Sequence, residues 1–450
     1  MATSTTYGSI TTDTKAAPRS GGCASAFKSL LKLILFTVIV AFIGLKFGLT
    51  VVLCLFLGLL VLAYAAVFAG FCYMARPYVR SIFEVPVAAL RLQFAILSAV
   101  AAYALRGFKP LFPEWTLSYE ICVRFLRFTF ENYGEIIAVE HAAMLRAPYR
   151  ELGKKRLPSS CLEHNTIPEV LQANGMEHQW IRDPEREKKA HRLVVIIYHG
   201  GGYAVADPLQ HVDLANQTHT LLQQILQSEH QLDVSVDVLL ANYRKAPEYP
   251  YPTPLNDCFD MYQYVLKHEN ILPSHVLLCG DSAGGEMAIT SCMRLREVAT
   301  PELQPLAAVC YSPLVDFKDR GNDEKQPFDL LSVKFTNRVL DSYLRTVTDP
   351  KERLLVSPIE NSLRDLPPMF LQWGTLECFF DQGVRFKAKA EAEGVTNMEF
   401  VFMPNMAHDP SMFPPSLCPG AEIAIRHGCT FAAKQAARVL RVTTEPEPEN

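Results

Sequence analysis

The stretch Cys279-Gly280-Asp281-Ser282-Ala283-Gly284-Gly285 follows a short apolar run at 275–278 and precedes residues 286–290, which have the pattern of a helix start. A strand, a Gly-x-Ser-x-Gly turn and a helix in succession are the context that a nucleophile elbow requires. Small neighbours on both sides of Ser282 allow the sharp bend and let a substrate carbonyl approach the hydroxyl. Ser282 is therefore the candidate nucleophile, and the alternative is a glycine-rich turn that carries an ordinary serine.

A second glycine-rich turn lies upstream. His199-Gly200-Gly201-Gly202-Tyr203 directly follows the apolar run 193–198, which has the character of a buried parallel strand. Three consecutive glycines are costly in backbone entropy, and they allow main-chain N–H groups to turn toward an external oxygen. We expect an oxyanion hole whose donors are the N–H groups of Gly201, Gly202 and Ala283.

A serine at neutral pH is a poor nucleophile, so a histidine has to take its proton and an acid has to orient that histidine. Two histidines lie well downstream of Ser282. His408, in the sequence MAHD at 406–409, follows the last predicted strand in a loop. His427 falls near the start of a C-terminal helical pattern, which is typical of a surface or packing histidine. His408 is therefore the candidate base.

Four motifs stand in a characteristic order: HGGG at 199–202, YRKAPE at 243–248, GDSAGG at 280–285 and YSP at 311–313. In this order they resemble the hormone-sensitive-lipase-like branch of the α/β-hydrolases, and the likeness extends over Trp180–Phe413. The overall layout also resembles that of the membrane-anchored arylacetamide and sterol deacetylases. The resemblance implies a carboxylester hydrolase with a serine, acid and histidine triad in that chain order.

The same resemblance places the acid three residues after Gly374. That position holds Glu377, where many relatives carry Asp. Asp381, one helical turn later, is the alternative, although an acidic residue at a helix start already has a structural explanation. We interpret His199, Arg244, Glu248, Asp257 and Asp281 as residues that shape or brace the surrounding loops.

The pattern between residues 180 and 403 alternates strands and helices. Strands are predicted at Trp180-Ile181 as an edge, and at 193–198, 236–241, 275–279, 307–311, 369–373 and 400–403; helices are predicted at 212–227, 254–268, 285–298 and 382–393. This alternation predicts the α/β-hydrolase fold, a doubly wound and mostly parallel sheet. Amphipathic patterns at 113–157 and the charged segment 316–348 are interpreted as a helical cap.

An uncharged run extends from Phe47 to Ala75 and exceeds the roughly 20 residues that cross a bilayer. The apolar run Leu33–Leu45 precedes it, so the anchor is either a hairpin or one long tilted helix. A third apolar run, Leu92–Leu105, is short for a span and favours a buried or interfacial helix. Basic residues flank the long run on both sides, so its orientation in the membrane stays open. The glycosylation sequon at Asn216 matters only if the catalytic domain is lumenal.

These patterns divide the chain into five parts. We expect a disordered tail at 1–27, a transmembrane anchor at 28–76, amphipathic or cap helices at 77–157, a catalytic domain at 158–442 and an acidic disordered tail at 443–450. The anchor predicts a membrane location, for which we favour the endoplasmic reticulum, with the side of the catalytic domain open.

Composition narrows the possible partners. Charged residues make up 20% of the chain and the formal net charge is −4, so no basic surface favours nucleic acid. The 12 cysteines show neither metal-ligand spacing nor a disulfide framework, and the predicted chemistry needs no cofactor. The prediction is a serine carboxylesterase, lipase or deacetylase that acts on a lipophilic ester, with membrane lipid as a partner. The alternatives are a non-catalytic ligand-binding relative and an acyltransferase.

Overall fold

The computed structural model describes residues 48–298, 303–321 and 326–442, together with Lys32, Leu35, Thr37, Val38, Ile39, Phe42, Lys46 and Glu324. The predicted disordered tails at 1–27 and 443–450 lie outside the described residues. Most of the run 33–45 lies outside them too, so the choice between a hairpin and a single helix stays a prediction. The chain divides into two units, Met1–Gly70 and Phe71–Asn450.

The predicted anchor is a helix, α2 (Leu49–Ala75), without a charged residue. Within Val51–Tyr78, an 18-residue window has a mean hydropathy of 2.9 and no buried residues, so the stretch qualifies as a candidate membrane span by length and composition. A signal sequence has the same properties.

A second apolar helix, α3 (Val85–Leu105), belongs to the second unit. Its stretch Ile82–Leu105 also passes the length and hydropathy test, but 33% of the window is buried. The buried side chains are mostly small and lie against α4 (Leu117–Glu135). A helix that packs on the protein along one face agrees with the expectation of a buried or interfacial helix. It begins at Val85, earlier than the predicted start at Leu92.

Eight strands form one sheet in the described part of the chain. They are β1 (Ile167–Ala173), β2 (Met176–Arg182), β3 (His191–Tyr198), β4 (Val234–Ala241), β5 (Val276–Asp281), β6 (Ala307–Tyr311), β7 (Met369–Gly374) and β8 (Met398–Met403). Their order is β1-β2-β4-β3-β5-β6-β7-β8. The first two neighbouring pairs in this order, β1–β2 and β2–β4, are antiparallel. The five pairs that follow, β4–β3, β3–β5, β5–β6, β6–β7 and β7–β8, are parallel. The prediction of an edge strand at Trp180 was wrong, because β1 pairs with β2 and takes the edge.

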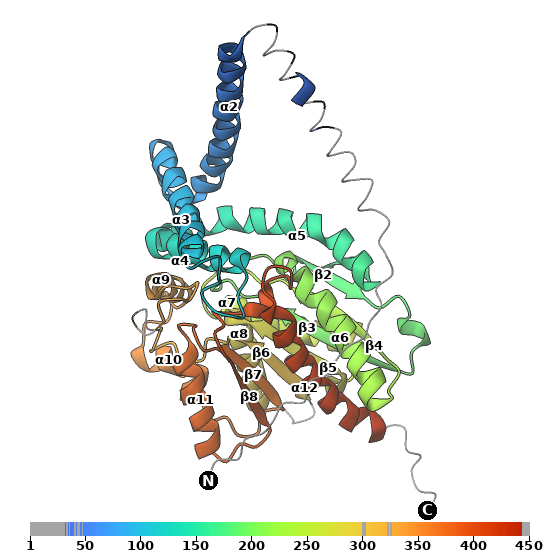
Figure 1. The fold of residues 1–450 in the computed structure, drawn as a ribbon. Coiled ribbons are helices and arrows are strands. Elements are labelled where there is room, and N and C mark those ends of the chain that lie inside the picture. Colours follow the sequence, from blue (N-terminus) through green and yellow to red (C-terminus); the bar gives the residue numbers. More distant parts are fainter. Residues whose placement is uncertain are drawn as a thin grey trace, which may run out of the picture. The chain divides into compact units, whose positions relative to one another are not determined.

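Helices cover both faces of the sheet. In Figure 1, α6 (Val212–His230) and α12 (Gly420–Val442) lie in front of the sheet, with α7 (Thr253–His268) and α8 (Ser282–Val298) behind it. The front helices share one buried apolar cluster with β3, β4 and β5. Further α-helices of the described residues are α5 (Ala142–His164), α9 (Val333–Tyr343), α10 (Pro350–Leu355) and α11 (Phe380–Ala392). The continuous burial of both faces explains why β3, β5 and β6 have no polar alternation in sequence.

The predicted amphipathic segment 113–157 forms α4 and α5, and both are attached to the sheet-bearing part of the unit. The indole nitrogen of Trp115, just before α4, donates to the carbonyl of Asn405 at 2.6 Å. Phe130 of α4 stacks on Phe335 of α9 with ring centroids 4.2 Å apart. Helix α4 and the inserted segment around α9 therefore pack against each other beside the carboxyl ends of the strands.

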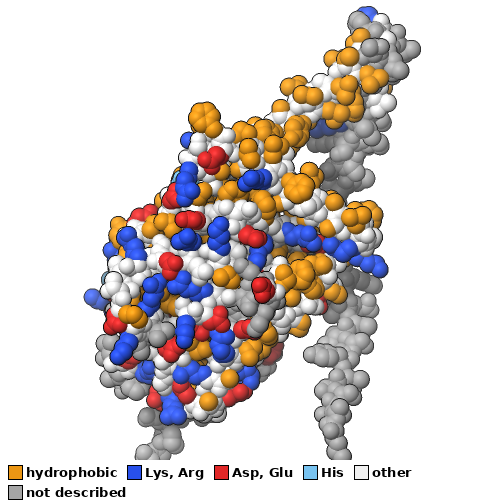
Figure 2. Space-filling view, turned by 90° about the vertical axis from the view of Figure 1, so that its left-hand side faces the viewer, with side chains coloured by type: hydrophobic (Ala, Val, Ile, Leu, Met, Phe, Trp, Pro, Cys, Tyr) orange, Lys and Arg blue, Asp and Glu red, His pale blue; other side chains and the backbone are white. Residues whose placement is uncertain are grey.

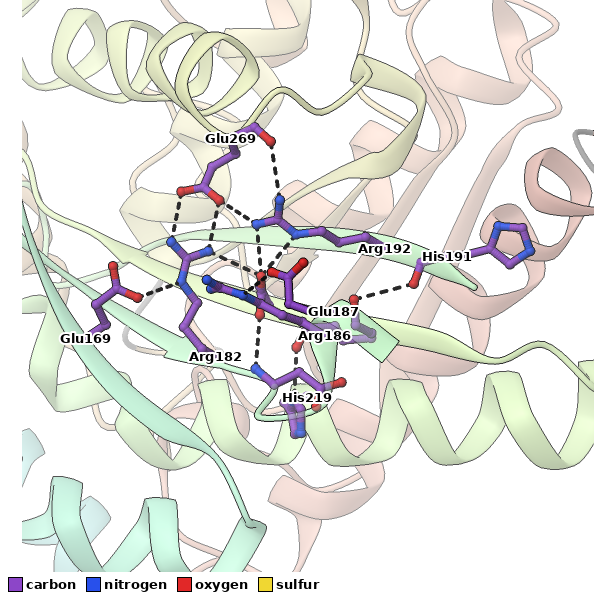
Figure 3. A network of polar contacts seen from close by, with 12 residues as sticks. Glu169, Arg182, Arg186, Glu187, His191, Arg192, His219 and Glu269 are labelled. Carbon is purple, nitrogen blue, oxygen red and sulfur yellow. Dashed lines mark hydrogen bonds and ion pairs between the residues drawn. The ribbon is translucent and has the colours of Figure 1, made fainter. Parts of the chain in front are cut away.

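A buried ionic network fixes the opposite, amino-terminal side of the sheet (Figure 3). The guanidinium groups of Arg182 and Arg192 both contact the carboxylates of Asp237 and Glu269. Because each of these four charges has a partner, removing one of them would leave a charge unpaired and destabilise the junction of β2, β3 and β4. On the face that Figure 2 shows, acidic and basic side chains are intermixed, and the formal net charge of the chain is −4.

Candidate active site

Ser282 lies at the junction of β5 and α8 with a φ angle of 51°, in the left-handed region that non-glycine residues rarely adopt. The turn is possible because its neighbours are small. A Cβ atom on Gly284 would lie 1.8 Å from the carbonyl oxygen of Tyr198 on β3. The geometry is that of a nucleophile elbow, and Ser282 lines a pocket together with His408.

The glycine loop after β3 also lines this pocket. Gly201 has a φ angle of 98° and packs so tightly that a Cβ atom would lie 2.5 Å from Cβ of Ala206. The N–H groups of Gly201 and Gly202 donate no hydrogen bond to another residue in the described part of the chain. Nδ1 of His199 lies 2.7 Å from the carbonyl oxygen of Gly200, and the ring stacks on Tyr243, so this histidine braces the loop.

The structure brings His408 and Glu377 together. Nδ1 of His408 lies 3.8 Å from Oε2 of Glu377, and both side chains are buried. Oε2 accepts hydrogen bonds from the hydroxyl of Ser312 at 2.6 Å and from the N–H of Gly374 at 3.0 Å. The carboxylate is thus fixed at the ends of β6 and β7, facing the loop that follows β8.

Burial and neighbouring charges shift the pKa values of this pair. Burial raises the pKa of the Glu377 carboxyl, and His408 only partly offsets that increase. For His408, burial lowers the pKa, but the carboxylates of Glu377, Asp329 and Asp281 outweigh burial and raise it above its ordinary value of 6.5. An imidazole of raised pKa is a stronger proton acceptor, as a general base requires.

Asp281, next to Ser282, joins three loops through its side chain. Oδ1 accepts the N–H of Gly200 at 3.0 Å and lies 2.8 Å from Nε2 of His211. Asp281 also interacts with Asp409, the residue after His408: burial, followed by the charge of Asp281, raises the pKa of Asp409 well above its ordinary range. The interpretation of Asp281 as a residue that shapes the elbow agrees with these contacts.

Sequence reasoning missed a further buried acid, Asp329. Its Oδ1 accepts the N–H of His408 at 2.7 Å, and its Oδ2 accepts the N–H of Cys378 at 2.8 Å. The residue lies in the segment 316–348, which was interpreted only as a cap. An acid inside the apolar run at 328–331 is the one signal that could have drawn attention to it.

The alternative residues lie elsewhere. Asp381 is in the first turn of α11, where its charge has the structural role expected of it, and His427 is exposed on α12. Arg244 pairs with Asp257 at 2.6 Å. Glu248 pairs with Arg146 of α5 at 2.8 Å, so these residues brace the loop after β4.

The sequon asparagine cannot receive a glycan in the folded chain. Asn216 is 0% exposed, and its amide nitrogen donates to the carbonyl of Val212 at 3.0 Å and to the hydroxyl of Ser160 at 3.1 Å. The sequon therefore gives no information about the side of the membrane.

The pocket has a volume of about 1090 Å³ and extends from Ser282 between the cap helices and α6. Its lining is mainly apolar and includes Leu126, Phe130, Leu152, Leu331, Phe335 and Val339. Within the described ranges, no group of three or more His, Cys, Asp or Glu residues could hold a metal ion.

Comparison with known proteins agrees with this geometry. Residues 195–411 match the family model for the alpha/beta hydrolase fold. The chain is 31% identical to an acetyl-hydrolase of Streptomyces hygroscopicus over 243 residues, which cover 53% of this chain and 74% of the relative. It is also 31% identical to an esterase of Acinetobacter venetianus over 219 residues, 48% of this chain and 67% of the relative.

Solved structures show the same relationship. The crystal structure of an esterase from the bacterial hormone-sensitive lipase family superposes with a TM-score of 0.53 at 28% identity, covering 64% of this chain and 90% of that one. An esterase/lipase from an uncultured bacterium gives a TM-score of 0.51 at 26% identity, covering 60% and 85%. This chain therefore belongs to the α/β-hydrolase family, among its esterases and lipases.

Proposed function

We propose that the protein is a membrane-anchored serine carboxylester hydrolase that acts on lipophilic esters through an acyl-enzyme intermediate. One observation carries this proposal: a strained serine at a strand-to-helix turn lines the same pocket as a buried histidine that faces a buried carboxylate. Ser282 is the nucleophile, His408 the base and Glu377 the acid. Asp381 is the less favoured acid, because it lies at a helix start instead of facing His408.

The reaction follows from these positions. His408 takes the proton of the Ser282 hydroxyl while the oxygen attacks the ester carbonyl, and Glu377 stabilises the imidazolium that forms. The N–H groups of Gly201, Gly202 and Ala283 stabilise the oxyanion, a role for which the loss of one donor costs about 3–4 kcal/mol. His408 then protonates the leaving alcohol. Water activated by the same histidine cleaves the acyl-enzyme and releases the acid.

The pocket favours an ester with a large apolar part. Its volume of about 1090 Å³ lies slightly above the roughly 300–1,000 Å³ of ordinary ligand pockets. Its apolar lining gains most from burying hydrocarbon, since burial contributes about 25 cal/mol per Å². Sterol acetates and acylglycerols are examples, because each combines an ester group with a large apolar part.

The anchor is the second half of the proposal. An uncharged 27-residue helix without a buried face is stable in a bilayer and is costly in water. We assign residues 28–76 to this anchor, 77–157 to cap helices and 158–442 to the catalytic domain. The location that we favour is the membrane of the endoplasmic reticulum, where lipophilic esters are available to the pocket.

Kinetics of one variant test the hydrolase assignment. Replacing Ser282 by Ala should abolish hydrolysis of p-nitrophenyl butyrate by the detergent-solubilised full chain. The matched control is Ser228→Ala, because Ser228 is an exposed helical serine on α6. Undiminished turnover in Ser282→Ala, at an unchanged melting temperature, would contradict the proposal.

A further inference from the structure

Asp329 lies just before α9, in the segment inserted between β6 and β7. Its side chain is 0% exposed and accepts three main-chain N–H groups: those of Leu330 at 2.8 Å, His408 at 2.7 Å and Cys378 at 2.8 Å. A carboxylate is rarely buried in this way unless donors satisfy it, and here two of the donors belong to other loops.

Those two loops carry the proposed base and the proposed acid. His408 follows β8, and Cys378 is the residue after Glu377 in the loop that follows β7. One carboxylate therefore holds the main chain of both loops, each through a charge-assisted hydrogen bond. Ser312 makes a comparable bridge on the other side, donating to Glu377 at 2.6 Å and accepting the N–H of Asp409 at 2.9 Å.

The segment that supplies Asp329 also contacts the glycine loop. A Cβ atom on Gly202 would lie 3.0 Å from Cγ1 of Val339 on α9, so this helix lies against the proposed oxyanion hole. Residues 329–339 thus adjoin both the base with its acid and the oxyanion donors. An ordinary cap covers a pocket, whereas this one supplies a polar group to the catalytic loops.

We propose that Asp329 is a positioning residue, which fixes the backbone of His408 and of the Glu377 loop so that the imidazole faces the carboxylate. This inference rests on the proposed function of the triad. Asp329 does not contact the reacting atoms and transfers no proton. Its carboxylate acts through His408, together with the other acids that face this histidine, Glu377, Asp281 and Asp409.

The test compares two buried acids of the same segment. Asp329→Asn removes the charge and replaces one acceptor oxygen by an NH₂ group. In one orientation of the amide this NH₂ group faces the N–H groups of Leu330 and His408, and in the other it faces the N–H of Cys378. The matched control is Asp316→Asn, because Asp316 is also buried, accepts the N–H groups of Lys318 and Asp319, and pairs with Arg385 away from the triad. Active sites are titrated with a fluorophosphonate, so that kcat refers to competent enzyme alone.

We expect Asp329→Asn to lower kcat about 10- to 100-fold, the effect of losing a hydrogen bond to a charged group. KM should stay close to the wild-type value, and the acidic limb of the kcat/KM profile should move to lower pH because a negative charge near His408 is lost. Asp316→Asn should change neither kcat nor the limb. Asp329→Ala, measured in parallel, should show a loss at least as large.

Two results would overturn the inference. One is a folded Asp329→Asn variant with wild-type kcat per titrated site and an unchanged acidic limb. The other is an equal loss of kcat in Asp316→Asn, which would show that any buried acid of the segment matters equally. Neither result touches the proposed function, which fails separately if the wild-type chain has no esterase activity.

Discussion

Nδ1 of His408 lies 3.8 Å from Oε2 of Glu377, just beyond hydrogen-bond distance, and both atoms are buried. The pair is held from both sides, since Ser312 and Gly374 donate to the carboxylate while Asp329 accepts the main-chain N–H of His408. Catalytic hydrogen bonds are often long in ligand-free enzymes and shorten when substrate binds. This geometry supports the proposed role of Glu377 in orienting the imidazole, and that role has consequences that can be measured.

Replacing Glu377 by Gln should lower kcat by about 10²- to 10⁴-fold, because a neutral amide neither holds the productive tautomer nor stabilises the imidazolium. The control is Asp381→Asn, which removes the alternative acid. Steady-state kinetics on a p-nitrophenyl ester compare the two. A larger loss in Asp381→Asn than in Glu377→Gln would show that the acid was assigned to the wrong residue.

The pH profile of kcat/KM should lose activity on the acidic side with a midpoint above 6.5. Neighbouring carboxylates raise the pKa of His408 despite its burial, so the imidazole is already protonated at a pH where an exposed histidine is still neutral. A protonated imidazole cannot accept the serine proton. An acidic midpoint clearly below 6.5 would contradict this account of the site.

Glu286 on α8 provides a test of stability. Burial raises its pKa to about 7, and the hydroxyls of Tyr203 and Thr290 only partly offset that increase. Between pH 4.5 and 7 the Glu286 carboxyl is therefore protonated in the folded chain but ionised in the unfolded chain. The contribution of this group to the free energy of unfolding is greatest at low pH and is lost as the pH rises through 7.

Glu286→Gln lacks this titration. Its melting temperature relative to wild type should therefore be higher at pH 8 than at pH 5, as thermal unfolding at the two pH values would show. A difference between variant and wild type that is the same at both pH values would mean that Glu286 does not titrate in this way.

The anchor prediction is tested by alkaline carbonate extraction of membranes from cells that express the full chain. Wild-type protein should stay in the pellet. The double variant Leu57→Arg and Leu60→Arg should shift to the supernatant, since each charge at the centre of a span costs about 2.5–3.5 kcal/mol. Leu272→Arg, at an exposed loop leucine, is the control and should stay in the pellet. A double variant that remains in the pellet would contradict α2 as the anchor.

The sequence predicts those parts of the site that are local in the chain. The elbow around Ser282 and the glycine loop at 199–202 have their chemistry in consecutive residues. His408 could be chosen because few histidines follow the nucleophile. The central strands were found because they are continuous apolar runs.

The contacts that hold the site together are distant in sequence and have no pattern of their own. Asp329 contacts a residue 79 positions away, and His211 meets Asp281 only because β3 and β5 are neighbours in the sheet. Strand β1 has mostly exposed residues, so no buried face marks it in sequence. Such features depend on the tertiary fold and appear only when the loops are placed.

The central claim is that Ser282 is an activated nucleophile, and intact-protein mass spectrometry after treatment with a fluorophosphonate tests it most directly. The reagent phosphonylates a serine only where a neighbouring base raises its reactivity. We predict one adduct per wild-type chain, located on Ser282, and none on Ser282→Ala. A wild-type chain that remains unlabelled, or a Ser282→Ala variant labelled to the same extent, would contradict the account.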